Sequence, residues 1–341
     1  MPAMIQIRHL RKEYKDLVAV KDLNLELEGG DIFGFIGPNG AGKTTTIKML
    51  ATLLTPTAGT AYVDGVDVVR YPEQVRAVVG YMPDFFGVYD DIKVWEYLDF
   101  FAAAYRISKD KRPQIIDDVL TLTDLNVKKD AYVESLSRGM KQRLCLAKTL
   151  VHDPKVLLLD EPASGLDPRA RIEIKELLKE LKAMGKTIIV SSHILPELAD
   201  FCNKIGIIEK GEMIVSGDVN DIIRQLSGAH TLEIRILDED SLPPLELDIA
   251  GLAAATPHEG GIAVKTTPAI ERAMTILRDL DSVADVKMGD NVLQVAYVGE
   301  PNGEWEVLRA LVREDIKVLG FGTQATDLED IFMRVTKGIV S

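Results

Sequence analysis

Long apolar runs and cysteine clusters are both absent from this chain of 341 residues. No run approaches the about 18–20 apolar residues that span a bilayer, and Met1–His9 lacks the apolar segment of a secretory signal. The two cysteines, Cys145 and Cys202, lie among apolar residues without metal-ligand spacing, which predicts reduced core thiols. From these absences we expect a cytoplasmic protein that remains able to dock on a membrane partner.

Acidic residues outnumber basic ones, 53 to 40. The formal net charge is −13, and residues 231–341 carry ten Lys and Arg against twenty Asp and Glu. Phosphate backbones are bound by clustered Lys and Arg, so this balance predicts no nucleic-acid partner. The simpler explanation of the acidic surface is that it keeps the protein soluble.

The hydrophobic pattern divides the chain into an α/β part, residues 1–226, and a small acidic α+β part, residues 227–341. Strands that alternate with helices predict a parallel-sheet core with helices on its faces, preceded by short alternating strands within residues 1–30 and interrupted by a helical insert at about 90–152. The expected core elements are strands 32–36, 156–159 and 187–190 and a helix at 44–54. After a helix at 221–226 and a linker at Ser227, we expect strands at 231–237, 261–266, 283–288, 291–298 and 316–321 and helices at 269–280, 304–314 and 327–336, for which a ferredoxin-like fold is one candidate.

Aromatic residues gather at the start of the insert. Nine of the chain's 20 aromatics fall between residues 81 and 105, namely Tyr81, Phe85, Phe86, Tyr89, Trp95, Tyr97, Phe100, Phe101 and Tyr105. Aromatic side chains in such numbers form either the core of the insert or an apolar groove for a partner. The sequence leaves both explanations open.

One glycine-rich segment predicts phosphate binding. Residues 37–44, Gly-Pro-Asn-Gly-Ala-Gly-Lys-Thr, fit G-x-x-x-x-G-K-[ST] after an expected strand and before an expected helix. Glycines let backbone N–H groups point at phosphate oxygens, and the helix N-terminus adds positive potential. The lysine reaches the β- and γ-phosphates, and the threonine hydroxyl can bind Mg²⁺. The candidate nucleotide-binding residues here are Gly37, Pro38, Asn39, Gly40, Ala41, Gly42, Lys43, Thr44 and Thr45, with Thr44 also a metal ligand.

Two acids follow the buried strand Val156–Leu159. Carboxylates at the carboxyl edge of a parallel sheet face the ligand crevice. We expect Asp160 to hold Mg²⁺ and Glu161 to polarise the attacking water. An acidic turn without function would be the simpler explanation if the phosphate loop were not present in the same chain.

A histidine follows another buried strand. His193 ends the segment Ser191-Ser-His193 that follows the strand Thr187–Val190, and at the same sheet edge it could contact the γ-phosphate or orient water. For the chain's other four histidines we expect structural roles.

Leu136-Ser-Arg-Gly-Met140, followed by Lys141-Gln-Arg143, lies about 90 residues after the phosphate loop and shortly before the Asp160 strand. In this order the motifs resemble those of the ATP-binding cassette (ABC) family, over about residues 4–220. The resemblance implies a P-loop NTPase cassette with a parallel-sheet core, an antiparallel β subdomain and a helical insert. It implies ATP and Mg²⁺ as ligands and ATP hydrolysis as the activity.

Further positions are similar to family motifs. Tyr14 resembles the aromatic that stacks on adenine, Ser164–Asp167 resembles the loop that signals across the dimer, and His193 matches the switch histidine. Asp84 stands where the family usually has a glutamine that contacts Mg²⁺ and water. Aspartate is shorter and charged, which puts that contact in question.

The signature segment itself departs from the family pattern Leu-Ser-Gly-Gly-Gln. Arg138 and Met140 replace a glycine and the glutamine, whereas Ser137 and Gly139 are kept. In the family this loop caps the ATP of the partner subunit. The resemblance therefore implies a homodimer, or a dimer with a related ATPase, in which each site takes Ser137 and Gly139 from the other chain.

The resemblance also implies partners. One cassette without a membrane span implies separately encoded transmembrane permease subunits, with this chain peripheral on the cytoplasmic face of the membrane. The extra C-terminal domain and residues 327–336 are similar to those of exporter ATPases of the ABC-2 type, in which the insert receives a helix of the permease.

Three alternatives remain. A soluble ABC-type switch acting on DNA or ribosomes conflicts with the acidic tail and the single cassette. A binding module with incidental turnover conflicts with the presence of Glu161 and His193. A kinase-like P-loop protein leaves the Leu136–Met140 segment unexplained.

Overall fold

The computed structural model describes residues 3–84, 87, 91–222, 230–237, 268–289, 292–300 and 303–323. Within these ranges the chain forms two compact units, one in residues 3–222 and one in residues 230–323. Each unit has a hydrophobic core of its own. None of the helices in the described ranges is long and apolar enough to cross a membrane.

A six-stranded sheet forms the centre of the first unit, and it confirms the predicted parallel core. Its order is β10-β9-β3-β8-β7-β6, and all neighbours pair in parallel except β10 with β9. The strands are β3 (Ile32–Ile36), β6 (Val79–Met82), β7 (Val156–Leu159), β8 (Thr187–Ser192), β9 (Lys204–Glu209) and β10 (Glu212–Asp218). Strands β3, β7 and β8 are buried along their whole length, as their continuous apolar sequences require. Because these three are neighbours, the segments that follow their carboxyl ends meet at one edge.

A separate antiparallel sheet adjoins this core, in the order β2-β1-β4-β5. Its strands are β1 (Ala3–Tyr14), β2 (Leu17–Glu28), β4 (Ala58–Val63) and β5 (Val66–Asp67), and helix α2 (Pro72–Val78) follows. The short strands expected in residues 1–30 are in fact two strands of 12 residues each. Register shifts in the β1–β2 pair interrupt the alternation of apolar residues, which is why the sequence pattern suggested shorter strands.

Helix α1 (Lys43–Leu50) is shorter than the expected helix at 44–54. Thr52 adopts φ 61°, and the Thr52 and Leu53 N–H groups donate to the carbonyls of Met49 and Lys48. This is a Schellman ending, which usually uses glycine at the left-handed position. A threonine there gives no sequence signal, so the helix end was placed too late.

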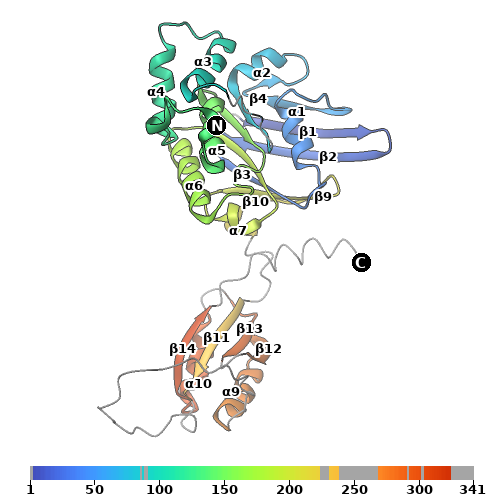
Figure 1. Cartoon of the computed structure of the whole chain (residues 1–341). Coiled ribbons are helices and arrows are strands. Elements are labelled where there is room, and N and C mark those ends of the chain that lie inside the picture. The colour runs from blue at the N-terminus through green and yellow to red at the C-terminus, as the bar shows by residue number, and fades with distance from the viewer. Residues whose placement is uncertain are drawn as a thin grey trace, which may run out of the picture. The chain divides into compact units, whose positions relative to one another are not determined.

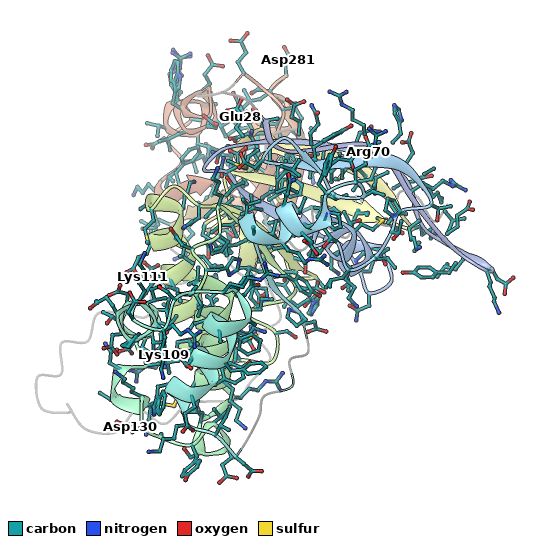
Figure 2. The ribbon with its side chains drawn as sticks, turned by 90° about the horizontal axis from the view of Figure 1, so that it is seen from above. Glu28, Arg70, Lys109, Lys111, Asp130 and Asp281 are labelled. Atoms are coloured by element: carbon teal, nitrogen blue, oxygen red, sulfur yellow. The ribbon has the colours of Figure 1, made fainter. Side chains whose placement is uncertain are left out.

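The insert is helical, as predicted. It contains α3 (Val94–Ala104), α4 (Arg112–Leu122), the 3₁₀ turns η1 (Asn126–Lys128) and η2 (Val133–Ser135), and α5 (Arg138–Leu150). Helices α3 and α4 lie on the opposite side of this unit from the β1–β2 hairpin (Figure 1). Seen from above, Lys109 and Asp130 of the insert likewise lie far from Arg70 (Figure 2). Helices α6 (Pro168–Ala183) and α7 (Leu195–Ala199) complete the unit.

The second unit contains one sheet with strand order β12-β13-β11-β14, antiparallel throughout. Along the chain its described elements are β11 (His230–Ile236), α9 (Pro268–Arg278), β12 (Val283–Met288), β13 (Leu293–Tyr297), α10 (Trp305–Arg313) and β14 (Val318–Thr323). This βαββαβ succession is that of a split βαβ unit. The strand expected near 261–266 and the helix expected at 327–336 lie outside the described residues, as does most of the helix expected at 221–226.

Candidate functional site

The glycine-rich segment curls between β3 and α1. At Gly37 there is no room for a side chain, because a Cβ there would lie 2.3 Å from the carbonyl oxygen of Ile208. At Gly42, which precedes the first helical residue, φ is 110°. Glycine alone adopts such a conformation without strain. The loop therefore presents its backbone to whatever occupies its concave side.

Lys43 points back into this loop. Its ammonium donates to the carbonyls of Gly37 at 2.5 Å and Pro38 at 3.2 Å, and it lies 3.5 Å from the Glu161 carboxylate. Burial lowers the pKa of Lys43, and the negative charges of Glu161, Asp160 and Asp84 oppose that shift. A buried ammonium among carbonyls and carboxylates can bind the oxygens of a phosphate chain.

Asp160 and Glu161 follow β7 and face β8. Asp160 is buried, and its Oδ1 accepts a hydrogen bond from the Ser191 hydroxyl at 2.7 Å. Its Oδ2 is buried without a hydrogen-bond partner among the described residues. An unpaired buried carboxylate oxygen is costly unless a cation or water compensates it, so this atom fits a role in holding Mg²⁺.

Glu161 adopts φ 51°, the left-handed region that side-chain-bearing residues rarely occupy. Its carboxylate lies 2.8 Å from Nδ1 of His193. The structure thus brings the candidate base and the candidate switch histidine into direct contact. Local backbone strain of this kind is concentrated at functional sites.

A cavity of about 320 Å³ is lined by the phosphate loop, Glu161 and His193, whereas Asp160 and Gly37 are not among its lining residues. The predicted site residues that line it are Tyr14, Pro38, Asn39, Gly40, Ala41, Gly42, Lys43, Thr44, Thr45, Asp84, Glu161 and His193. Leu17, Ala19 and Ser164 also line it. Residues of β1, β2 and α1 and the segments that follow β3, β6, β7 and β8 therefore line one cavity, at the carboxyl edge of the central sheet.

Ser137 and Gly139 are not among the described residues that line this cavity. Ser137 is the N-cap of α5 and accepts a hydrogen bond from the Met140 N–H at 3.3 Å. Arg138 donates to the carbonyl of Ser164 at 3.3 Å. The signature segment is thus attached to the loop after Glu161 but takes no part in lining the cavity beside the phosphate loop of its own chain.

Comparison with known proteins agrees with this geometry. The family model described as ABC transporter matches residues 20–164. The Nod factor export ATP-binding protein I of Cupriavidus metallidurans is 38% identical over 260 residues, which cover 76% of this chain and 85% of that protein. The protein of the same name from Burkholderia orbicola is 40% identical over 232 residues, 68% of this chain and 76% of that protein.

The chain belongs to the ABC transporter family. Solved structures agree with this assignment. An ATP-binding subunit of an ABC transporter superposes with a TM-score of 0.60 at 29% identity, covering 66% of this chain and 93% of that one. A dimeric ATP-binding cassette in a post-hydrolysis state with ADP and phosphate gives 0.59 at 25% identity, covering 63% and 99%. This chain is accordingly the ATP-binding subunit of an ABC transporter and an ATP hydrolase, as predicted.

The aromatic cluster of this ABC subunit is mixed in character. Tyr97 is 1% exposed and contacts Phe101, with ring centroids 5.0 Å apart, so it is a core residue. Phe100 is 53% exposed, and Tyr105 is also exposed. Phe85, Phe86 and Tyr89 lie outside the described residues.

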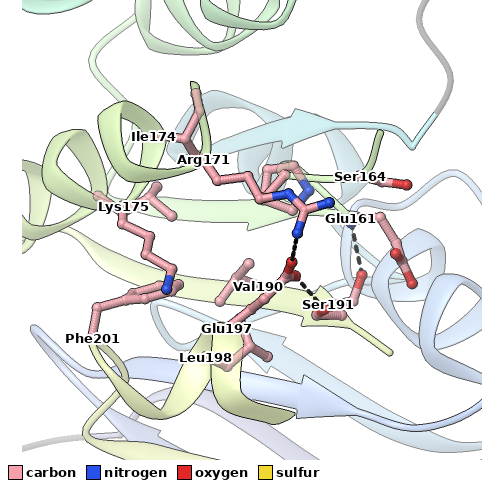
Figure 3. Close-up of a pocket in the computed structure, with 14 residues that line it drawn as sticks. Glu161, Ser164, Arg171, Ile174, Lys175, Val190, Ser191, Glu197, Leu198 and Phe201 are labelled. Atoms are coloured by element: carbon pink, nitrogen blue, oxygen red, sulfur yellow. Dashed lines mark hydrogen bonds and ion pairs between the residues drawn. The ribbon is translucent and has the colours of Figure 1, made fainter. Parts of the chain in front are cut away.

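Sequence reasoning did not assign a role to Ser191, which contacts both acids of this ABC ATPase. It also missed the ion pair of Arg171 with Glu197 at 3.0 Å. Both residues line a small cavity of about 20 Å³ that Glu161 also lines (Figure 3). The position of Ser191 after a buried strand was the one available signal. Its partners lie 30 and 31 residues away, so no local pattern could reveal them.

Proposed function

We propose that this ABC ATPase works as a dimer that drives a separately encoded exporter, with two ATP molecules bound between the subunits. The observation that supports this proposal most is that the phosphate loop, Glu161 and His193 line one cavity, whereas Ser137 and Gly139 lie outside its described lining. A second chain is the simplest source for a signature segment at that cavity. Each subunit would then cap the nucleotide held by the other.

The chemistry proposed for the site assigns one task to each group. Backbone N–H groups of Gly40–Thr45 and the Lys43 ammonium bind the β- and γ-phosphates, and Tyr14 contacts the adenine. Thr44 and Asp160 would hold Mg²⁺, and Asp84, which lines the same cavity as Thr44, would act through water. When bound, Mg²⁺ neutralises charge on the phosphate oxygens.

Hydrolysis is assigned to Glu161 and His193. Glu161 accepts a hydrogen bond from the attacking water and orients it towards the γ-phosphate. His193, 2.8 Å from the same carboxylate, fixes the direction in which the carboxylate points. Loss of the γ-phosphate removes charge that the two subunits share, which favours separation of the dimer.

Export and membrane attachment are supported by the relatives. Proteins 38–40% identical to this chain are named export ATP-binding proteins. The similar protein cbiO1 of Clostridium perfringens, 27% identical with a TM-score of 0.60 over 65% of this chain and 91% of that one, is described as part of the complex cbiONQ. We therefore propose separate permease partners, attachment to the cytoplasmic face of the membrane, and the exposed aromatics of the insert as part of the docking surface.

A mixing experiment tests the shared site. Lys43→Met removes the phosphate-binding ammonium but keeps the signature segment, and Ser137→Glu places an acid in the signature segment but keeps the phosphate loop. If sites are shared, a mixture of the two inactive variants regains ATP turnover, because mixed dimers hold one intact site. Ser135→Glu, at an exposed position two residues away, is the matched control and should stay active. A mixture no more active than its components would overturn the shared site.

The permease assignment has its own test. Co-expression with a candidate permease should give a detergent-stable complex whose ATPase activity depends on the permease. An ATPase that is fully active yet binds no such protein would favour the alternative of an ABC-type switch without a permease.

A further inference from the structure

Ser191 links the two candidate carboxyl residues through a single hydroxyl group. The side chain is fully buried, on β8. Its Oγ donates to Oδ1 of Asp160 at 2.7 Å and accepts from the backbone N–H of Glu161 at 2.9 Å. Figure 3 shows Ser191 beside Glu161, at the end of the strand that carries it.

The sheet register makes this contact possible. Strands β7 and β8 are parallel neighbours in which Leu159 pairs with Val190. Asp160 directly follows the end of β7 and Ser191 follows Val190 within β8, so the hydroxyl meets the carboxylate across the sheet edge. A serine hydroxyl has one hydrogen, which goes to the carboxylate, and its lone pairs remain for the Glu161 N–H.

The bond to Glu161 acts on a strained residue. Glu161 has φ 51°, a conformation that persists only where surrounding contacts hold it. A hydrogen bond to the peptide N–H of a residue fixes the orientation of that peptide plane, and with it the direction in which the chain leaves the strand. By accepting this N–H, Ser191 holds the turn that presents the Glu161 carboxylate to Lys43 and His193.

The bond to Asp160 acts on the other carboxylate. With Oδ1 engaged by Ser191, it is Oδ2 that stays buried without a hydrogen bond among the described residues. The hydroxyl therefore selects which carboxylate oxygen is left for a cation. Ser192, the next residue, bonds instead to Glu197 and to the N–H of Ile194, away from both acids.

We propose that Ser191 is a positioning residue that fixes the metal-binding carboxylate and the base-bearing turn at the same time. The proposal rests on the roles proposed above for Asp160 and Glu161. Loss of the hydroxyl would leave Asp160 free to rotate and would release the turn at Glu161. Turnover and divalent-cation affinity should then fall together, while binding of the nucleotide without a metal is unaffected.

The test compares Ser191→Ala with Thr187→Ala in the full chain. Thr187 lies at the opposite end of β8, is equally buried, and accepts a hydrogen bond from Gly30 N–H at 2.9 Å. Both variants lose one buried hydroxyl from the same strand, so a general loss of stability affects both. Ser191→Cys, which keeps nearly the same volume with a weaker donor, serves if the alanine variant does not fold.

We expect Ser191→Ala to lower kcat by about ten- to hundredfold, the range for losing a hydrogen bond to a charged group, with KM for ATP little changed. Mn²⁺ binding to the protein–ADP complex, followed by electron paramagnetic resonance, should weaken in Ser191→Ala and not in Thr187→Ala. Binding of a fluorescent ATP analogue in EDTA should match the wild type. Ser191→Cys should fall between the wild type and Ser191→Ala.

Equal kcat and equal Mn²⁺ affinity in Ser191→Ala and Thr187→Ala would overturn the role of Ser191. Asp160→Asn and Glu161→Gln separate that failure from failure of the proposed function. If both of those variants abolish turnover and Ser191→Ala behaves like the control, only the Ser191 proposal falls. If Asp160→Asn and Glu161→Gln both hydrolyse ATP at the wild-type rate, the proposed function is wrong, and the Ser191 proposal is wrong with it.

Discussion

The Lys43 ammonium lies 3.5 Å from one oxygen of the Glu161 carboxylate, and the other oxygen lies 2.8 Å from His193 Nδ1. The candidate base is thus held between a cation of the phosphate loop and a ring that follows the next strand. Burial lowers the pKa of Lys43, and the Glu161 charge is the first of the groups that oppose this shift. The charges of the Lys43 ammonium and of the Glu161 carboxylate therefore stabilise each other.

Glu161→Gln should keep ATP binding and lose turnover. An amide of the same shape cannot take up a proton, and removing a carboxylate base costs about 10²–10⁴-fold in rate. We expect the variant with ATP and Mg²⁺ to run as a dimer in size-exclusion chromatography with light scattering. A variant that hydrolyses ATP at the wild-type rate would show that Glu161 is not the base.

Tyr14→Ala should weaken ATP binding by about two- to tenfold, since an aromatic contact of this kind is worth about 0.5–1.5 kcal/mol. Tyr14 lines the cavity and is 45% exposed, with the Lys12 ammonium 5.2 Å from its ring centroid. Titration calorimetry of the Ala and Trp variants measures the effect, and the Trp variant should bind as the wild type does. Tyr71, also an exposed tyrosine but not part of the cavity lining, supplies the control Tyr71→Ala.

Gly37→Ala should destabilise the first unit more than Gly40→Ala does. At Gly37 the new Cβ meets the Ile208 carbonyl, so strand β9 or the loop must move. At Gly40, where φ is 82°, nothing lies within 4 Å of a Cβ, and the cost is limited to the left-handed backbone, about 1–2 kcal/mol. Thermal unfolding of both variants decides the order, and equal melting temperatures would contradict it.

Asp31→Asn tests whether the hydrogen-bonded carboxylate of Asp31, which lies outside the candidate site, makes the stability of the fold depend on pH. Burial raises the pKa of Asp31, but hydrogen bonds from Lys204, Asn203 and the Glu28 N–H outweigh burial and leave it below the ordinary 3.8. A carboxyl group with a lowered pKa stabilises the fold above its unfolded pKa and loses this contribution as the pH falls through the folded value.

At neutral pH we therefore expect Asp31→Asn to lower the free energy of unfolding, measured in urea, by about 1.5–3 kcal/mol, the range for hydrogen bonds to a charged group. The difference from the wild type should shrink as the pH falls through the lowered pKa of Asp31, where its carboxyl group becomes protonated in the folded protein. Asp64→Asn, which removes the partially exposed ion pair with Lys155, should cost less than about 1 kcal/mol. If the difference in unfolding free energy between the wild type and Asp31→Asn does not change with pH, the stabilising role of the Asp31 charge is wrong.

Helix α5 holds the loop after Glu161 by two side chains of unequal burial. Gln142 is buried and donates to the Pro162 carbonyl at 2.6 Å, whereas Arg138 is exposed and donates to the Ser164 carbonyl at 3.3 Å. Gln142→Ala leaves a buried carbonyl unpaired, which costs about 1–3 kcal/mol. We expect Arg138→Ala to cost distinctly less, because water can replace the exposed donor. Urea unfolding of the two variants, with Arg138→Lys as the conservative control, measures the difference.

Much of the proposed phosphate-binding site could be predicted because its chemistry is local. The roles proposed for the glycines, Lys43 and Thr44 depend on backbone conformation and spacing within eight consecutive residues. The same holds for the buried strands, whose apolar sequences identify them without any knowledge of their neighbours. The end of α1 at Thr52 was misplaced because a threonine in the left-handed conformation is determined by its contacts and not by its own preference.

The sequence by itself determined that segments 32–36, 156–159 and 187–190 become core strands and that residues 37–44 are the candidate phosphate loop, since these follow from side-chain pattern and backbone freedom. The tertiary structure alone decided that β3, β7 and β8 are neighbours, and so that Lys43, Glu161 and His193 meet. It also decided that Ser191 joins the two acids and that Ser137 and Gly139 lie outside the described lining of the cavity. The physical reason is that strand order and register arise from packing between distant segments, which no window of neighbouring residues contains.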